Sequence, residues 1–282
     1  MNYLPMTTDS QLEPSSSVPP TADPETGGQM TFFEHLVELR KRIIHALAAT
    51  VIGAVIGWYL APRFIFIIAR PIRKALVDAK MPDELVFTGP TEYLGLLITL
   101  SIYLGIVLAS PYILYQVWLF VAPALYKHER SAITGFLFST VLLFLGGIAF
   151  GYFVMLPQLL KFLIGISQTG PGIPFIKPLI KVSEYLDLIL TVLLGLGLVF
   201  EIPILIFFLS VFEIVTPKFL IQNSKYAILA ITILAAVITP TPDAMTMLIF
   251  MTPMVALYFV GVGVSWAVVS RRERRLAAES RG

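Results

Sequence analysis

Residues 93–126 read YLGLLITLSIYLGIVLASPYILYQVWLFVAPALY, and this stretch contains no Asp, Glu, Lys or Arg. A helix needs about 20 mostly apolar residues to cross a bilayer core roughly 30 Å thick. The stretch is longer than one straight crossing requires. Pro111 and Pro123 each remove a helix amide, so we expect a kinked membrane helix here.

The whole chain shares this apolar character. Of its 282 residues, 57% are hydrophobic and 13% are charged, and the mean hydropathy is +0.83. A soluble domain is about 45–50% apolar and about 25% charged. The composition therefore excludes a soluble enzyme, an acidic disordered chain and a nucleic-acid binder. The chain has no cysteine, and its three histidines are scattered, so we expect no disulfide, metal site or cofactor.

Five further apolar stretches bring the expected number of crossings to six. They lie at 43–61, 131–160, 183–212, 226–238 and 246–269. The fifth crossing, 226–238, gives only about 20 Å of helix, which is short for a bilayer. We expect extramembrane loops at 62–92, with a short amphipathic helix, and at 161–181. A tight turn is expected at 239–243.

The distribution of charge orients the six crossings. With an even number of crossings both termini share one side, and that side holds 12 of the 20 Lys and Arg residues. The positive-inside rule therefore places both termini in the cytoplasm. We divide the chain into a disordered tail (1–29), a membrane domain (30–270) and a basic cytoplasmic tail (271–282). A capping box formed by Thr31 and Glu34 is expected to begin the first helix.

Glu201 is an acid deep within the crossing at 183–212. An ionisable residue at this depth costs about 2.5–3.5 kcal/mol on insertion scales, so it normally faces protein or water. Glu201 is interpreted as a polar contact point inside a groove. The alternative is a protonated carboxyl bonded to a neighbouring helix or to the Val199 carbonyl, which Pro203 leaves unpaired.

Glu38 and Glu129 are carboxylates at the predicted cytoplasmic face. Glu38 and Arg42 are spaced i,i+4 in the favourable order, so a simple helix-surface ion pair is one interpretation. Glu34 lies one turn earlier, and two carboxylates on one face would suit a cationic peptide. Glu129 lies in a four-residue polar turn, where a charge is most often solvated.

Several other functional classes lack their sequence signals. The two halves share no repeat of motif or loop length, which argues against the usual architecture of secondary transporters. No glycine-rich carbonyl filter or charged helix face indicates a channel. No phosphate-binding loop indicates ATP hydrolysis.

Two long motifs resemble TatC, the receptor subunit of the twin-arginine protein translocase. They are residues 33–42 (FEHLVELRKR) and 110–130 (SPYILYQVWLFVAPALYKHER). Three shorter motifs, at 87–92, 200–203 and 239–243, resemble further family motifs in the expected order. The resemblance covers about residues 30–270.

The resemblance implies an all-α integral membrane protein, a concave bundle of six helices with a short fifth and sixth helix. TatC proteins bind twin-arginine signal peptides and export folded proteins across the inner membrane. They work with the single-span partners TatA and TatB in complexes that hold several TatC copies. They use the proton-motive force and no nucleotide.

The resemblance also implies roles for particular residues. Glu38 and Glu129 would face the arginine pair, since a guanidinium fork suits a carboxylate and lysine cannot reproduce it. The remaining residues of that patch would be Arg40, Phe120, Pro123, Leu125 and Tyr126. Glu201 would lie in the membrane groove, and Pro71 and Asp243 would serve assembly and function. Three positions depart from the family pattern: Thr99 falls where many relatives have a lysine, and Met247 and Phe259 make the polar patch between the last two helices thinner.

We therefore expect a signal-peptide receptor that is not an enzyme. The main alternative is a proton-coupled secondary transporter of a small molecule with Glu201 as proton carrier, which predicts saturable solute uptake by this chain alone. A purely structural scaffold predicts that changes at Glu38 and Glu129 are harmless.

Overall fold

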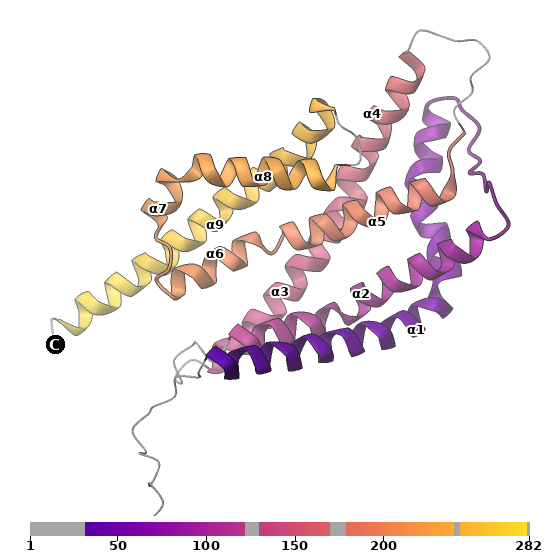
Figure 1. The fold of residues 1–282 in the computed structure, drawn as a ribbon. Coiled ribbons are helices and arrows are strands. Elements are labelled where there is room, and N and C mark those ends of the chain that lie inside the picture. The colour runs from indigo at the N-terminus through magenta and orange to yellow at the C-terminus, as the bar shows by residue number, and fades with distance from the viewer. Residues whose placement is uncertain (1–31, 122–129, 170–178, 240–242, 281–282) are drawn as a thin grey trace, which may run out of the picture.

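The computed structural model describes residues 32–121, 130–169, 179–239 and 243–280, and these fold into helices joined by short connections (Figure 1). In chain order the helices are α1 (Phe32–Asp78), α2 (Glu92–Val121), α3 (Arg130–Phe150), η2 (Gly151–Met155), α4 (Leu156–Thr169), α5 (Val182–Val199), α6 (Ile202–Val211), α7 (Pro217–Gln222), α8 (Ser224–Ile238) and α9 (Ala244–Glu279). The predicted tail at 1–29, the Thr31 cap, the kink at Pro123 and most of the turn at 239–243 lie outside the described residues.

Within the described ranges, five helical segments are long and apolar enough to cross a membrane. They are Phe33–Asp78, Glu92–Phe120, Leu137–Ser167, Val182–Val211 and Ala244–Arg274, and the shorter apolar helix Ser224–Ile238 accompanies them. Large apolar side chains such as Val51, Leu142 and Leu205 are exposed on their outer faces. A continuous apolar exterior is unfavourable in water but suits helices that face lipid.

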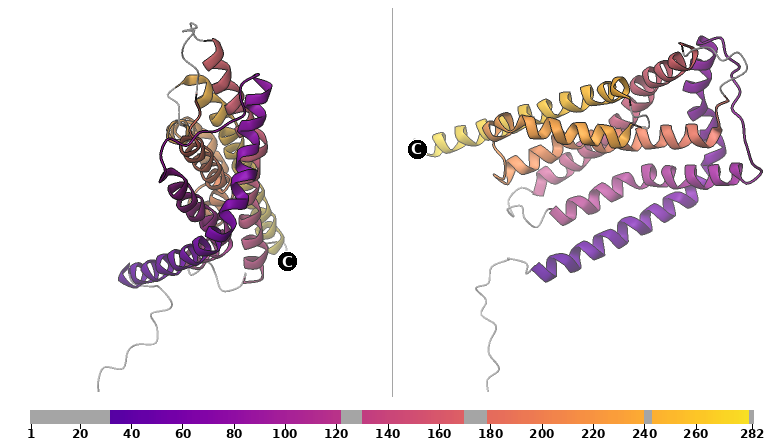
Figure 2. Two further views of the ribbon diagram at one scale, coloured as in Figure 1. Left: turned by 90° about the vertical axis from the view of Figure 1, so that its right-hand side faces the viewer. Right: turned by 45° about the horizontal axis from the view of Figure 1, so that its top comes forward.

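The first half of α1 and α2 run side by side, because small residues line the contact (Figures 1 and 2). A Cβ atom on Gly53 would lie 2.5 Å from the Gly105 carbonyl oxygen, and one on Gly57 would lie 2.6 Å from the Ser101 carbonyl oxygen. Gly53 and Gly57 are four residues apart, as are Ser101 and Gly105. Such small-residue spacing allows membrane helices to approach closely.

α1 continues beyond the predicted crossing at 43–61. The helix passes through Pro62 and Pro71 to Asp78, and only residues 79–91 are non-helical. The helix expected within 62–92 is therefore present, but it continues the first crossing instead of forming a separate element. Pro71 cannot donate to the Ile67 carbonyl, but the Tyr152 hydroxyl donates to that oxygen at 2.7 Å. α1 also turns sharply along its length without breaking (Figure 2).

The third and fourth crossings also differ from the prediction. α3, η2 and α4 form one continuous helical segment that includes a π-helical turn before Pro157 and reaches Thr169, so the loop expected from 161 begins later. The fourth crossing is two helices. α5 ends at Val199, and α6 begins after a turn at Phe200 and Glu201, with Pro203 in its first turn.

The last two membrane helices differ in length. α8 has 15 residues, or about 22 Å, and is short as predicted. The expectation of a short sixth helix is wrong, because α9 has 36 residues, or about 54 Å. Residues 271–279 contain no Pro or Gly and are mostly Arg, Glu, Leu and Ala, which favour helix. Arg272 also forms an ion pair with Glu213.

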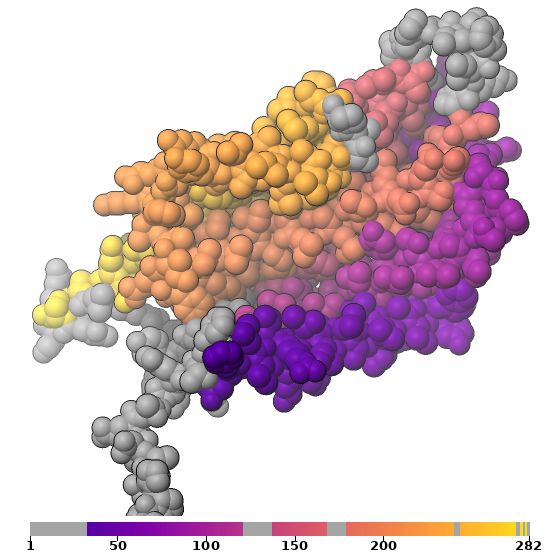
Figure 3. All heavy atoms as spheres, viewed as in Figure 1, coloured from indigo at the N-terminus to yellow at the C-terminus, as the bar shows by residue number. Residues whose placement is uncertain are grey.

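The buried side chains form two clusters along the molecule. One cluster joins the second half of α1 to α2, α4 and α5, and the other joins η2, α4, α5 and α6 to α8 and α9. In the space-filling view α1 and α2 form one long edge, and α6, α8 and α9 form the opposite edge (Figure 3). α5 contributes to both clusters and so links the two edges.

Candidate binding site and family membership

Glu38 lies on the first part of α1, and only one of its two carboxylate oxygens accepts a hydrogen bond. Its side chain is 15% exposed, and Oε1 accepts a hydrogen bond from Arg42 Nη2 at 3.0 Å. The predicted i,i+4 pair is therefore confirmed. The second oxygen, Oε2, is buried and has no hydrogen-bond partner among the described residues. A buried carboxylate oxygen without a partner is costly, so this position favours an additional donor.

Arg42 connects this carboxylate to the neighbouring helix. Its Nη1 donates to Gln116 Oε1 of α2 at 3.2 Å, and Gln116 is buried. The sequence analysis did not single out Gln116. A signal was present, because Gln116 carries the only side-chain amide in the charge-free run 93–126.

An aromatic stack lies at the same end of the α1–α2 pair. The His35 and Phe120 rings are stacked, with centroids 4.3 Å apart and planes at 22°. His35 precedes Glu38 by three residues, so the stack and the carboxylate lie one helical turn apart. Arg40 is exposed on the same helix. Pro123, Leu125, Tyr126 and Glu129 lie outside the described residues.

This arrangement is suited to binding a guanidinium group. A carboxylate with an unused oxygen can accept the planar donor fork of arginine, and guanidinium planes also stack on aromatic rings. Of the seven residues predicted for the patch, the structure describes Glu38, Arg40 and Phe120. Glu38 pairs with Arg42 of its own helix, and Phe120 of α2 stacks on His35 of α1. The Arg40 side chain is exposed to solvent.

Glu201 occupies the turn between α5 and α6. Its Oε1 is buried without a hydrogen-bond partner among the described residues, so this oxygen is not bonded to the Val199 carbonyl. The backbone path is nearly helical, because Glu201 N donates to Leu198 O at 3.1 Å and Leu205 N donates to Glu201 O at 2.9 Å. The turn therefore presents the acid with little loss of backbone hydrogen bonding.

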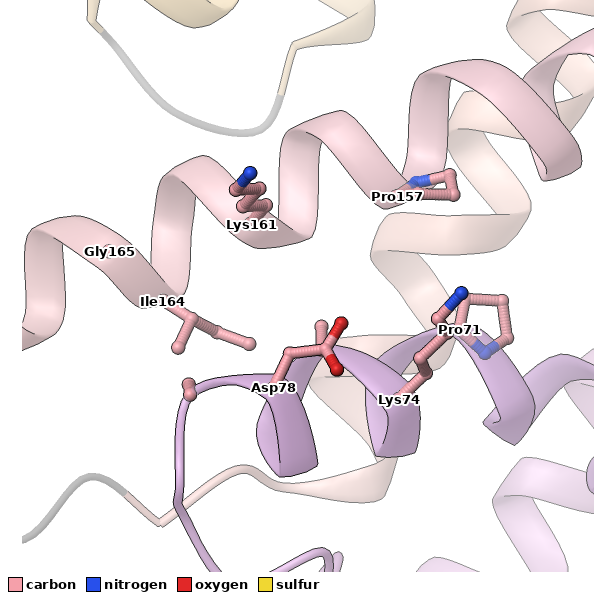
Figure 4. Close-up of a pocket in the computed structure, with 9 residues that line it drawn as sticks. Pro71, Lys74, Asp78, Pro157, Lys161, Ile164 and Gly165 are labelled. Carbon is pink, nitrogen blue, oxygen red and sulfur yellow. The ribbon is translucent and has the colours of Figure 1, made fainter.

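Pro71 and Asp243 have local environments that differ from each other. Pro71 lines a cavity of about 560 Å³ between the second half of α1 and α4, together with Lys74, Asp78 and Lys161 (Figure 4). Asp243 caps α9, because its Oδ1 accepts from Thr246 N at 2.8 Å and its Oδ2 accepts from the Thr246 hydroxyl. Capping by aspartate satisfies a first-turn amide that would otherwise lack a partner.

The described residues contain no group of three or more His, Cys, Asp or Glu side chains that could hold a metal ion. Near the α1–α2 contact, the described polar side chains are instead a carboxylate, a guanidinium and an amide that pair with one another: Glu38, Arg42 and Gln116. The residues that the structure brings together thus favour recognition of a charged ligand.

Comparison with known proteins identifies the same family that the motifs resemble. The family model for "Sec-independent protein translocase protein (TatC)" matches residues 34–253. The TatC of Koribacter versatilis is 46% identical over 253 residues, covering 89% of this chain and 91% of that protein. The TatC of Aquifex aeolicus is 36% identical over 233 residues, covering 83% of this chain and 93% of that protein.

Solved structures agree with the sequence comparison. A crystal structure described as "Twin Arginine Translocase Receptor- TatC" superposes with a TM-score of 0.73 at 36% identity, covering 83% of this chain and 99% of that chain. A second crystal structure of that receptor, in DDM, gives a TM-score of 0.70 at 35% identity. The family match, the identities and the shared fold together show that this multi-pass membrane protein belongs to the TatC family of Sec-independent protein translocase proteins.

Proposed function

We propose that this chain binds twin-arginine signal peptides at its cytoplasmic face and is the core receptor subunit for export of folded proteins. The observation that carries the proposal is the Glu38 carboxylate, which is mostly buried and leaves Oε2 without a partner. A peptide guanidinium would supply the missing donor. A charge-assisted hydrogen bond of this kind is about twice as strong as a neutral one.

The second arginine of the peptide would bind Glu129. Two guanidinium groups need two carboxylates, and Glu129 is the acid of the predicted cytoplasmic turn. Phe120 supports the proposal, because its stack with His35 is an apolar, aromatic surface next to Glu38. Arg40, Pro123, Leu125 and Tyr126 would complete the surface that binds the peptide.

The proposed topology has six crossings with both termini in the cytoplasm of the inner membrane. The five long apolar segments and the shorter α8 support this number. The excess of Lys and Arg on the side of the termini supports the orientation. The tail at 1–29 and the basic segment 271–282 would then flank the membrane domain, 30–270, on its cytoplasmic side.

Transport itself would require partners. TatA- and TatB-type single-span proteins would dock on the last two membrane helices, several copies of the chain would assemble, and the proton-motive force would drive export without enzymatic chemistry in this subunit. The length of α8 supports this view, because a helix of about 22 Å thins a bilayer of roughly 30 Å around it. Met247 and Phe259 would make the partner contacts on these helices less polar than in many relatives, and Thr99, on α2, falls where many relatives have a lysine.

Three further residues receive roles in this proposal. Glu201 would be the polar contact point in the membrane groove, which its buried, unpartnered Oε1 supports. Pro71 would contribute to assembly through the second half of α1, and Asp243 would contribute through the start of α9, which it caps.

Binding of a twin-arginine signal peptide to the purified chain in nanodiscs tests the proposal. The Lys-Lys variant of the peptide and the Glu129→Gln protein are measured beside it. We expect either change to weaken binding about tenfold or more, since each removes a charge-assisted hydrogen bond. Equal binding in all three measurements would contradict the proposal. Saturable solute uptake that depends on Glu201 would instead favour the transporter.

A further inference from the structure

The two oxygens of Glu38 differ in a way that the proposed function does not explain. Arg42 already holds Oε1 at 3.0 Å, while Oε2 is buried without a partner. The binding site for an arginine thus contains an arginine of its own. A peptide guanidinium that used Oε2 alone would make a single hydrogen bond beside the positive charge of Arg42.

The strongest contact between arginine and carboxylate is bidentate. Two parallel N–H donors then reach both carboxylate oxygens at once. To make this contact with Glu38, the incoming guanidinium must remove Arg42 Nη2 from Oε1. Binding therefore includes an exchange of one guanidinium for another.

Gln116 makes this exchange feasible. Arg42 Nη1 already donates to Gln116 Oε1 at 3.2 Å, so Arg42 keeps a hydrogen-bond partner when it leaves Glu38. Displacement frees Arg42 Nη2 as well, and the Gln116 carbonyl oxygen has a second lone pair that can accept this donor after a small movement of the guanidinium. An arginine that lost its sole partner in this setting would resist displacement.

We propose that Arg42 is a resident guanidinium that competes with the signal peptide for Glu38, that Gln116 is its alternative partner, and that the two together set the affinity of the site for cationic peptides. The proposal rests on the proposed function and names residues that regulate the same site. Only a ligand that binds Glu38 better than Arg42 does can occupy the site.

Lysine is the weaker competitor for Glu38 for a geometric reason. Its ammonium is a compact point charge that cannot span both oxygens as the planar guanidinium fork does. Against an empty carboxylate, lysine would lose some affinity but would still be attracted by charge. Against a carboxylate that Arg42 occupies, both ligands also bear the cost of displacing Arg42, so both affinities fall by the same factor and the ratio between them stays the same.

The test compares Arg-Arg and Lys-Lys signal peptides on three proteins in nanodiscs: wild type, Arg42→Met and Lys41→Met. Arg42→Met removes the competing cation and keeps an unbranched side chain of similar length. We expect it to strengthen Arg-Arg and Lys-Lys binding about tenfold each, because neither peptide then has to displace a resident cation. Lys41→Met removes one exposed cation next to Arg42 in sequence and controls for net charge.

The double variant with Gln116 gives a second readout. Gln116→Leu removes the alternative partner of Arg42, so Arg-Arg binding should weaken about fivefold. Adding Arg42→Met to Gln116→Leu should restore this loss, because no resident guanidinium then needs a partner. A general packing defect at Gln116 would not be rescued by a second substitution.

The outcomes separate this inference from the proposed function. If Arg-Arg binding depends on Glu38 but Arg42→Met does not strengthen it, the competition is overturned and the receptor function stands. The same holds if Arg42→Met and Lys41→Met strengthen binding equally. If Arg-Arg binding is unaffected by Glu38→Gln, both proposals are overturned.

Discussion

Glu38 and Glu92 are carboxylates at opposite ends of the α1–α2 pair, and they differ in how completely they are hydrogen-bonded. Glu92 Oε1 accepts from Ser183 Oγ at 2.6 Å, and its Oε2 accepts from the Thr88 amide at 2.5 Å and the Thr88 hydroxyl at 3.1 Å. Glu38 has one donor at Oε1 and none at Oε2.

The difference separates a structural acid from a binding acid. Glu92 connects the 79–91 loop to the start of α5, next to the bridge between Val86 and Lys181, and its acceptor sites are filled by this chain. Glu38 retains acceptor capacity at the end where its helix meets α2. Both residues are glutamates near helix ends, so sequence position does not distinguish them. The number of hydrogen bonds that each carboxylate already accepts indicates which one is available to a ligand.

The largest expected effect is the loss of peptide binding when Glu38 becomes neutral. Glu38→Gln should weaken binding of a twin-arginine peptide about a hundredfold, since a charge-assisted pair with a fork-shaped donor is replaced by a neutral amide. Glu92→Gln should leave peptide binding unchanged and instead increase proteolytic cleavage within 79–91. Titration of both proteins in nanodiscs, with limited proteolysis alongside, measures the two effects.

Wild-type protein provides the reference in both assays. The comparison fails if Glu92→Gln weakens peptide binding as much as Glu38→Gln does. It also fails if Glu38→Gln changes cleavage of the far loop, because the two ends would then be coupled through the helices.

The next effect concerns the close contact between α1 and α2 at Gly53 and Gly105, on helices that also bring Arg42 to Gln116. Gly53→Leu should destabilise the protein by about 2 kcal/mol, because the added side chain meets the Gly105 backbone at 2.5 Å. Gly95→Leu, on α2 where a Cβ meets nothing within 4 Å, is the matched control. Thermal unfolding in detergent should show a lower Tm for Gly53→Leu alone. Equal Tm values would mean that α1 and α2 separate without cost.

The positions of the crossings could be predicted from the sequence, whereas the ends of several helices could not. Apolar runs such as 93–126 are a local property of composition, and helices occupy most of the described residues of each run. Pro71 is also local, but whether it ends a helix depends on Tyr152, which lies 81 positions away in sequence and satisfies the Ile67 carbonyl. Helix ends fixed by such distant hydrogen bonds are outside the reach of local rules.

The candidate site shows the same division. The Glu38–Arg42 pair was predicted, because its i,i+4 spacing is written in the sequence. The role of Gln116 was missed, since it depends on how α2 aligns with α1 across 74 positions of sequence. That alignment follows from the close approach of Gly53 and Gly105, which no single-helix pattern reveals.

A smaller effect is expected where tyrosines hold the far half of α1. Tyr152→Phe and Tyr185→Phe each remove a hydroxyl that donates to a carbonyl next to Pro71, at Ile67 and Ile68 respectively. Each should cost about 1 kcal/mol, with the larger loss for the buried Tyr185. Thermal unfolding measures the loss, and Tyr59→Phe, on an exposed side chain of α1, is the control. A smaller Tm change for Tyr185→Phe than for Tyr59→Phe would show that the hydrogen bond from Tyr185 to the Ile68 carbonyl does not stabilise α1.

The smallest effect is a pH dependence of the 79–91 loop. The Arg73 guanidinium donates to Asp83 Oδ2 at 2.6 Å and holds the pKa of that carboxyl below its usual value. Because the folded-state pKa is lowered, the pair stabilises the loop above the unfolded pKa of about 3.9 and this contribution is lost as pH falls through the lower folded value. Pepsin cleavage within 79–91 should therefore rise below about pH 4 in wild type. Asp83→Asn should be cleaved faster at about pH 5 and should respond less to further acid, because the residue no longer titrates. If the two proteins instead gave parallel pH profiles, the Arg73–Asp83 pair would not stabilise the loop. The hydrogen bonds of Glu92 and the bridge at Val86 would then be sufficient to hold it.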